Sequence, residues 1–260
     1  MKKVLVASLM IPFCISTSVF AKDTDVKTYN LKPVKGSDII LDDITYSINN
    51  NEIHVAVEGK AHSKGIQSYK IEIDPNTKTY KTTELTREEI EKEVLDEEEL
   101  KELKELSTEP LRISPYERKD YYTGWMKITT EDPVRVAVCA TKLTLKWEED
   151  IDGLIEETSH NLKPWAANPT KFDTHWYIDS SGDTPPKANK DNSKITYKGY
   201  ADYYNDDFGL KDWRTHVNHE LKMVALPFSD GDGGFDYSWD YDASGDSSAL
   251  LSFTLTTSMD

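Results

Sequence analysis

Residues 134–147 read VRVAVCATKLTLKW, and this stretch decides the fold class that the sequence predicts. Apolar residues alternate with other residues along it, which is typical of a β-strand with one face in a core. The alternation runs on even positions from Val134 to Ala140 and on odd positions from Leu143 to Trp147. A change of phase by one residue is what a β-bulge produces, so we expect a bulged strand here.

Similar runs lie on both sides of this stretch. Residues 44–48 and 53–57 alternate with period two around three asparagines, which predicts a hairpin, and residues 69–73 and 122–130 predict two more strands. Further strands are expected at 174–179, 194–204, 214–226, 235–242 and 249–257. Many short strands separated by turn residues favour a mainly β fold, with an antiparallel β-sandwich-like C-terminal domain.

One segment, residues 86–107, is expected to be helical. Thr86 and Glu89 form a capping-box pattern at its start, and Asp96 with Glu99 forms a second one, so the helix is expected to break near Asp96. The segment is strongly acidic, which indicates either a solvated face or a docking surface. Because Pro110 follows it, we expect residues from 113 onward to fold without it.

The chain is therefore divided into four parts. Residues 1–21 are expected to be a cleavable signal peptide, because Lys2 and Lys3 precede an apolar run and Ala21 fits a cleavage site. Residues 22–85 form a small β-rich region, residues 86–112 the acidic helical segment and linker, and residues 113–260 the sandwich-like domain. The expected location is extracellular, or periplasmic if the source has an outer membrane.

Charge and cysteine content limit the partners. The formal net charge of −16 disfavours nucleic acid as a partner. No stretch after the signal is apolar enough to predict a membrane span in the mature chain. Cys139 is the only cysteine beyond the signal and is expected to be a buried, unreactive thiol.

Residues 200–213 mix aromatic rings with acidic and amide groups. Sugar-binding sites use aromatic faces for stacking and carboxylates as acceptors for hydroxyl groups. The alternative is a core strand followed by a polar turn. The candidate ligand-binding residues are Tyr203, Tyr204, Asp206, Asp207 and Trp213.

A glycine-rich loop at 229–236 carries Asp230, Asp232 and Asp236. Three carboxylates in seven residues could hold Ca²⁺, although the spacing departs from an EF-hand loop. The alternative is a hairpin connection in which Asp-Gly supplies positive φ. Calcium is the one cofactor that the sequence suggests.

The segment 216–220 contains two histidines close in sequence, His216 and His219, followed by Glu220. In a strand His216 and Glu220 share one face while His219 lies on the other, so the two rings cannot bind one metal ion. In a helix the spacing of three residues would allow it, but Val217 and Pro227 favour a strand. No catalytic residue can be named from the sequence. The leading hypothesis is a secreted, non-enzymatic β-sandwich protein that recognises a protein or glycan at a cell surface. The alternatives are a carbohydrate-binding module, with or without calcium, and a secreted hydrolase.

Overall fold

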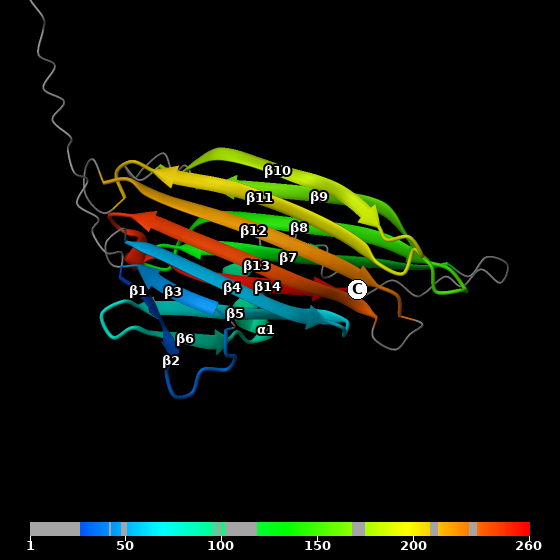
Figure 1. Ribbon diagram of the computed structural model, residues 1–260, viewed down its shortest axis with the longest axis horizontal. Coiled ribbons are helices and arrows are strands. Elements are labelled where there is room, and N and C mark those ends of the chain that lie inside the picture. The colour runs from blue at the N-terminus through cyan, green and yellow to red at the C-terminus, as the bar shows by residue number, and fades with distance from the viewer. Residues whose placement is uncertain are drawn as a thin grey trace, which may run out of the picture.

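The computed structural model describes residues 27–41, 43–47, 51–95, 97, 100–101, 119–167, 175–208, 213–228 and 233–260. Two seven-stranded sheets lie face to face (Figure 1). The expected signal peptide, residues 1–21, lies outside the described residues. Within the described residues, no helix is long and apolar enough to cross a membrane.

The first sheet, sheet A, is antiparallel throughout. Its strands, in spatial order, are β1 (Thr28–Asn30), β3 (Asp43–Ser47), β4 (Glu52–Ala61), β13 (Gly234–Gly245), β12 (Thr215–Leu226), β11 (Ile195–Asn205) and β10 (Tyr177–Ala188). The hairpin expected around residues 49–51 is confirmed as β3–β4, in which Ser47 pairs with Glu52.

The second sheet, sheet B, is antiparallel except for the short parallel pair β2–β6. Its strands, in spatial order, are β2 (Lys32–Pro33), β6 (Thr79–Glu84), β5 (Gly65–Asp74), β14 (Ser252–Met259), β7 (Asp120–Glu131), β8 (Ala137–Glu149) and β9 (Ile155–Ala166). The mainly β, sandwich-like fold is therefore as expected.

The core lies between the sheets because alternate residues of each central strand point inward. Along β11 and β12 the odd-numbered side chains are buried and the even-numbered ones face outward. Leu143, Leu145 and Trp147 of β8 fill the same core from sheet B. Gly199 of β11 faces inward, and a Cβ there would lie 2.8 Å from Leu162, so glycine allows close packing at this point.

The N-terminal and C-terminal strands share both sheets. In sheet A, β4 pairs with β13, and in sheet B, β5 pairs with β14. Ile53 and Ile71 therefore pack in the same core as Trp147. The regions 22–85 and 113–260 do not have separate cores, and a fragment from residue 113 onward would lack the partners of β13 and β14.

A bulge is present in residues 134–147, but it lies at Val138 and not between Ala140 and Leu143 as the alternation predicted, and the strand begins later. Thr130 pairs with Cys139 and Glu131 pairs with Ala137, so Val138 is the extra residue. Val134 and Val136 are not strand residues: they lie in the β7–β8 turn with their side chains exposed. Cys139 is fully buried as expected, and burial raises the pKa of its thiol.

The acidic segment begins as the sequence predicts. Thr86 and Glu89 form both hydrogen bonds of a capping box at α1 (Arg87–Glu89). A π-helical turn, η1 (Ile90–Val94), follows, and the backbone becomes extended at Leu95, next to the expected break at Asp96. Residues 102–118 lie outside the described residues.

This segment packs on the outer face of sheet B. Ile90, Val94 and Leu95 form a second apolar cluster with Trp125 of β7. The ammonium group of Lys127 donates a hydrogen bond to the Val94 carbonyl oxygen at 3.0 Å. The expectation that this segment is dispensable is therefore not supported by the packing, because removing it would expose Trp125 and leave the buried Lys127 without this acceptor.

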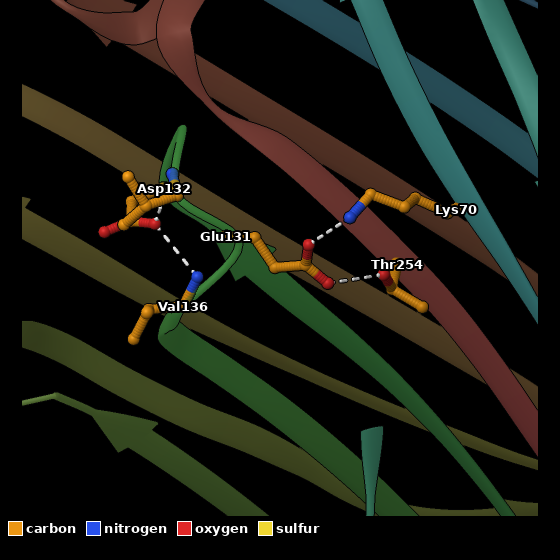
Figure 2. A network of polar contacts seen from close by, with 6 residues as sticks. Lys70, Glu131, Asp132, Val136 and Thr254 are labelled. Atoms are coloured by element: carbon orange, nitrogen blue, oxygen red, sulfur yellow. Dashed lines mark hydrogen bonds and ion pairs between the residues drawn. The ribbon is translucent and has the colours of Figure 1, made fainter. Parts of the chain in front are cut away.

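Further buried polar groups lie on the same outer face. Figure 2 shows the carboxylate of Glu131 between Lys70 of β5 and Thr254 of β14. Its Oε2 accepts from Lys70 Nζ at 2.5 Å, and its Oε1 accepts from Thr254 Oγ1 at 3.0 Å. Next to it, the Asp132 carboxylate accepts from the Val136 amide and shapes the β7–β8 turn (Figure 2).

Two strands of the sandwich have largely polar, exposed side chains. β9 was not expected from the sequence, and β10 is much longer than the expected strand at 174–179. They are edge strands of different sheets and lie beside each other at one margin (Figure 1). The carboxylate of Asp183 in β10 accepts from Tyr197 Oη at 2.8 Å and lies 3.9 Å from His160 of β9.

Candidate functional site

The candidate site lies on the outer face of sheet A, where β10, β11 and β12 meet the β11–β12 loop. Strand register places Tyr177 of β10 opposite Tyr204 of β11, and Tyr204 opposite His216 of β12. All three side chains point outward because the inward positions of β11 and β12 are odd-numbered. The register therefore builds one row of rings across three strands.

The rings are held in contact by stacking. Tyr177 and Tyr204 have ring centroids 5.2 Å apart and planes inclined by 24°. His216 lies on the other side of Tyr204, with 6.3 Å between centroids. Tyr177 remains 41% exposed, so the pair presents apolar surface to solvent. Such contacts restrict the rings before any ligand arrives, which lowers the entropic cost of binding.

Arg214, just before β12, completes this group. Its guanidinium carbon lies 4.9 Å from the centroid of the Tyr204 ring, a cation–π arrangement. Its Nε lies 3.1 Å from Oδ1 of Asp206 at the end of β11. Asp206 thereby orients the guanidinium over the tyrosine. We call Tyr177, Tyr204, Asp206, Arg214 and His216 the tyrosine–arginine cluster.

A row of hydrogen-bonded polar groups adjoins the cluster. Asp202 of β11 accepts from Ser180 Oγ at 2.5 Å and from Asn218 Nδ2 at 2.6 Å. In the next two strands, Asp242 and His54 are in contact, with 2.7 Å between Oδ1 and Nδ1. The carboxylate oxygens of Asp202 and Asp242 are therefore fixed in position on the outer face.

Exposed large apolar side chains gather at the same end of the sandwich. At this end, on the left in Figure 1, β7, β9, β11 and β13 finish and β8, β10, β12 and β14 begin. Its exposed large apolar residues are Val134, Val136, Trp165, Tyr177, Ile178, Trp213 and Leu250. Patches of exposed apolar and aromatic side chains are typical of binding surfaces.

The structure does not place all of the ligand-binding residues expected from the sequence on one surface. Tyr204, Asp206 and Trp213 lie at this surface, and Asp207 is exposed in the adjoining turn, where its amide donates to Asn205 Oδ1. Tyr203 is wrongly placed in that set. It faces the core and is fully buried, because neighbouring strand residues point to opposite faces.

Three residues of the cluster are absent from the ligand-binding set expected from the sequence, and one of them, His216, was considered only as a metal ligand together with His219. Arg214 was overlooked although it follows Trp213 directly, and Tyr177 lies in another expected strand with no sequence pattern that joins it to residue 204. Only the pairing of β10 with β11 brings Tyr177 to Tyr204.

The calcium candidates are only partly described. Asp230 and Asp232 lie outside the described residues, so calcium remains a prediction. Asp236 lies on the outer face of β13, where its Oδ1 is 3.0 Å from His62 Nε2 and 3.9 Å from Lys60 Nζ. Within the described ranges, no group of three or more histidine, cysteine or acidic side chains is arranged to hold a metal ion.

His219 belongs to a buried hydrogen-bond network between the sheets. Its two ring nitrogens each lie 2.9 Å from a threonine hydroxyl, Nε2 from Thr130 and Nδ1 from Thr141. The Tyr203 hydroxyl donates to the Ala140 carbonyl oxygen at 2.6 Å. Burial lowers the pKa of His219 to about 3, so the ring is neutral in the folded chain. His216 and His219 lie on opposite faces, as the strand alternation predicts.

Comparison with known proteins gives no relative. The chain matches no family model, no curated protein and no solved structure.

Proposed function

We propose that this chain is an exported, non-enzymatic recognition protein that binds a protein or glycan at a cell surface through the tyrosine–arginine cluster. The observation that carries the proposal is the exposed Tyr177–Tyr204 stack with Arg214 lying over it. Tyrosine, tryptophan and arginine are the residues that most often dominate binding energy at interfaces. Export rests on the apolar segment 1–21 of the sequence.

The polar surroundings of the cluster also support recognition. Asp202 and Asn218 are hydrogen-bonded to each other beside the rings, which suits a polar rim around an aromatic centre. The Asp206 carboxylate is paired with Arg214, so the charge of this arginine is partly balanced before a ligand binds.

The experiment compares binding of purified variants to envelope fractions of the producing cells by co-sedimentation. Tyr177→Ala/Tyr204→Ala should reduce binding at least about tenfold, since hot-spot residues contribute about 2 kcal/mol or more each. The matched control is Tyr121→Ala, which removes an exposed tyrosine at the other end of the sandwich. Equal binding by both variants and the parent chain would contradict the proposal.

Within this proposal, a carbohydrate is the alternative to a protein as the ligand, and a different observation favours it. On the outer face of β11, Tyr200 and Tyr204 lie on either side of Asp202, about 13 Å apart along the strand. The Tyr200 ring lies over Gly182 of β10, where an added Cβ would come within 3.1 Å of the ring. The exposed rings of Tyr200 and of Tyr177, which is stacked on Tyr204, lie near this acceptor, and such an arrangement suits a sugar chain.

A glycan array distinguishes the two candidates. A carbohydrate ligand predicts binding to a defined set of neutral oligosaccharides that Tyr200→Ala and Tyr204→Ala each weaken. Binding to envelopes that persists after their glycans have been removed enzymatically would instead indicate a protein ligand.

A further inference from the structure

A second surface lies at the far end of the β10–β11 hairpin, about 25–30 Å along β10 from Tyr177. Here the strand register shifts: Thr184 pairs with Lys198, whereas Lys187 pairs with Thr196. The shift places one extra residue in β10 at Pro185-Pro186, where neither residue has an amide hydrogen to donate. Next to this bulge is a surface hollow of about 420 Å³.

The lining of the hollow combines three kinds of group. Lys187 and Lys198 are the charged residues of the lining, Pro185 and Ala188 are the apolar ones, and Thr184 and Thr196 are two of the polar ones. Thr196 and Lys198 are even-numbered residues of β11, so the hollow opens on the outer face of sheet A.

The region around the hollow is basic in an otherwise acidic chain. The whole sequence has 47 acidic and 31 basic residues. Between residues 184 and 198, however, there are four lysines, at positions 187, 190, 194 and 198, and one acidic residue, Asp191. The Asp191 carboxylate accepts from the amide and hydroxyl of Ser193, at 3.3 and 2.8 Å, so it is engaged in the turn.

Strand register adds a fifth lysine. Lys222 of β12 lies directly opposite Lys198 on the same outward face. Like charges at directly opposed positions destabilise a sheet, and an anion bound between them would remove that penalty. Among the described residues, neither Lys198 nor Lys222 forms an ion pair, although Glu220 lies diagonal to Lys198 on β12.

We propose that this hollow binds a polysaccharide carrying sulfate or phosphate groups. Lys187, Lys198 and Lys222 would contact the anionic groups, while Pro185 would contact the apolar face of a sugar ring. A chain-like ligand is favoured over a single anion because the lysines extend around the hairpin turn at Lys190 and Lys194. This site is separate from the tyrosine–arginine cluster, so it stands or falls independently of the proposed function.

The test measures binding of the full chain to dextran sulfate, with neutral dextran as the comparison ligand. Because the net charge of the chain repels a polyanion, binding requires a local basic surface. We expect dextran sulfate to bind, neutral dextran not to bind, and affinity to fall with added salt. Lys187→Gln/Lys198→Gln should weaken binding about a hundredfold, because each lost charge-assisted contact is worth about 1.5 kcal/mol, or about a factor of ten.

Two further variants control for charge and structure. Lys81→Gln/Lys146→Gln changes the net charge equally at two exposed lysines of sheet B and should bind as the parent does. Lys187→Arg/Lys198→Arg keeps the charges and should retain binding. The proposal is overturned if the parent chain does not bind dextran sulfate, or if the Gln variant at 187 and 198 binds equally well. Binding to vesicles of anionic lipid without binding to dextran sulfate would also overturn it.

Discussion

The outer faces of the two sheets differ in how they meet solvent. On sheet B, Trp125 is only 7% exposed because Ile90 and Val94 pack against it, and Lys127 and Glu131 are buried with it. On sheet A, Tyr200 and Tyr177 are each about 40% exposed, as is Trp213 just before β12. Sheet B exposes Tyr121 at one end of β7 and Trp165 on its edge strand β9. The difference indicates that the centre of the outer face of sheet B serves folding, whereas the outer face of sheet A leaves aromatic and charged groups accessible for binding.

The largest expected effect comes from removing the strands that join the two regions of the chain. A fragment of residues 113–260 lacks β4 and β5, the partners of β13 and β14. It would also lose Ile53 and Ile71 from the core. We expect no cooperative unfolding transition for this fragment by circular dichroism in urea, in contrast to the full chain. A sharp transition would show that the acidic helical segment and the N-terminal strands are dispensable for folding.

A smaller loss of stability is expected when the contact between the helical segment and Trp125 of sheet B is weakened. Ile90→Ala should lower the free energy of unfolding by about 2–4 kcal/mol, because Ile90 is buried against Trp125. The emission of Trp125 should also shift to longer wavelength. Ile151→Ala is the matched control, since Ile151 is 84% exposed and its loss should change stability by less than about 0.5 kcal/mol. Equal effects of the two substitutions would mean that the segment does not pack on sheet B.

The buried histidine predicts a pH dependence of the core between the sheets. Because the pKa of His219 is lowered to about 3, the unfolded chain binds a proton below about pH 6.5 that the folded chain does not. Stability therefore falls by about 1.4 kcal/mol per pH unit as pH decreases from 6.5 towards 3. Between pH 7 and 4.5, urea unfolding should show a loss about 2–3 kcal/mol larger in the parent chain than in His219→Gln. The same loss in both chains would contradict this account of His219.

Breaking the Lys70–Glu131 ion pair on the outer face of sheet B should reduce stability by a similar or smaller amount. Glu131→Gln leaves Lys70 without its carboxylate partner and weakens the bond from Thr254. We expect a loss of about 1–3 kcal/mol in urea unfolding, because the remaining ammonium group stays largely buried. The control is Glu148→Gln, whose partner Lys119 is far more exposed, so the expected loss is smaller than that of Glu131→Gln.

The sequence predicted those parts of the fold in which local patterns decide structure. Alternation predicted β11 and β12 almost to their ends, and the Thr86–Glu89 pattern predicted the capping box. It did not predict β9, or β10 beyond residue 179, because edge strands exposed on most sides need no apolar alternation and β10 contains two prolines.

Both candidate sites are assembled by the pairing of strands that are distant in sequence, and local sequence patterns do not reveal that pairing. Tyr204 and Asp206 were identified from a mixed aromatic and acidic segment, but Tyr203 was included with Tyr204 although neighbouring residues of a strand point to opposite faces. The basic hollow was missed because a net charge of −16 describes the whole chain and not the hairpin at 184–198. Lys198 and Lys222 are 24 residues apart in sequence and become neighbours only through the β11–β12 register.

Hydroxyl-radical footprinting with and without the envelope fraction tests the central claim that the outer face of sheet A is the binding face. In the free chain, Trp213 and Tyr177 should be oxidised readily and Trp125 only slowly. Addition of envelopes should protect Tyr177, Tyr204 and Trp213, while Tyr121 at the opposite end stays reactive. Protection of Tyr121 with unchanged oxidation of Tyr177 and Trp213 would contradict the claim.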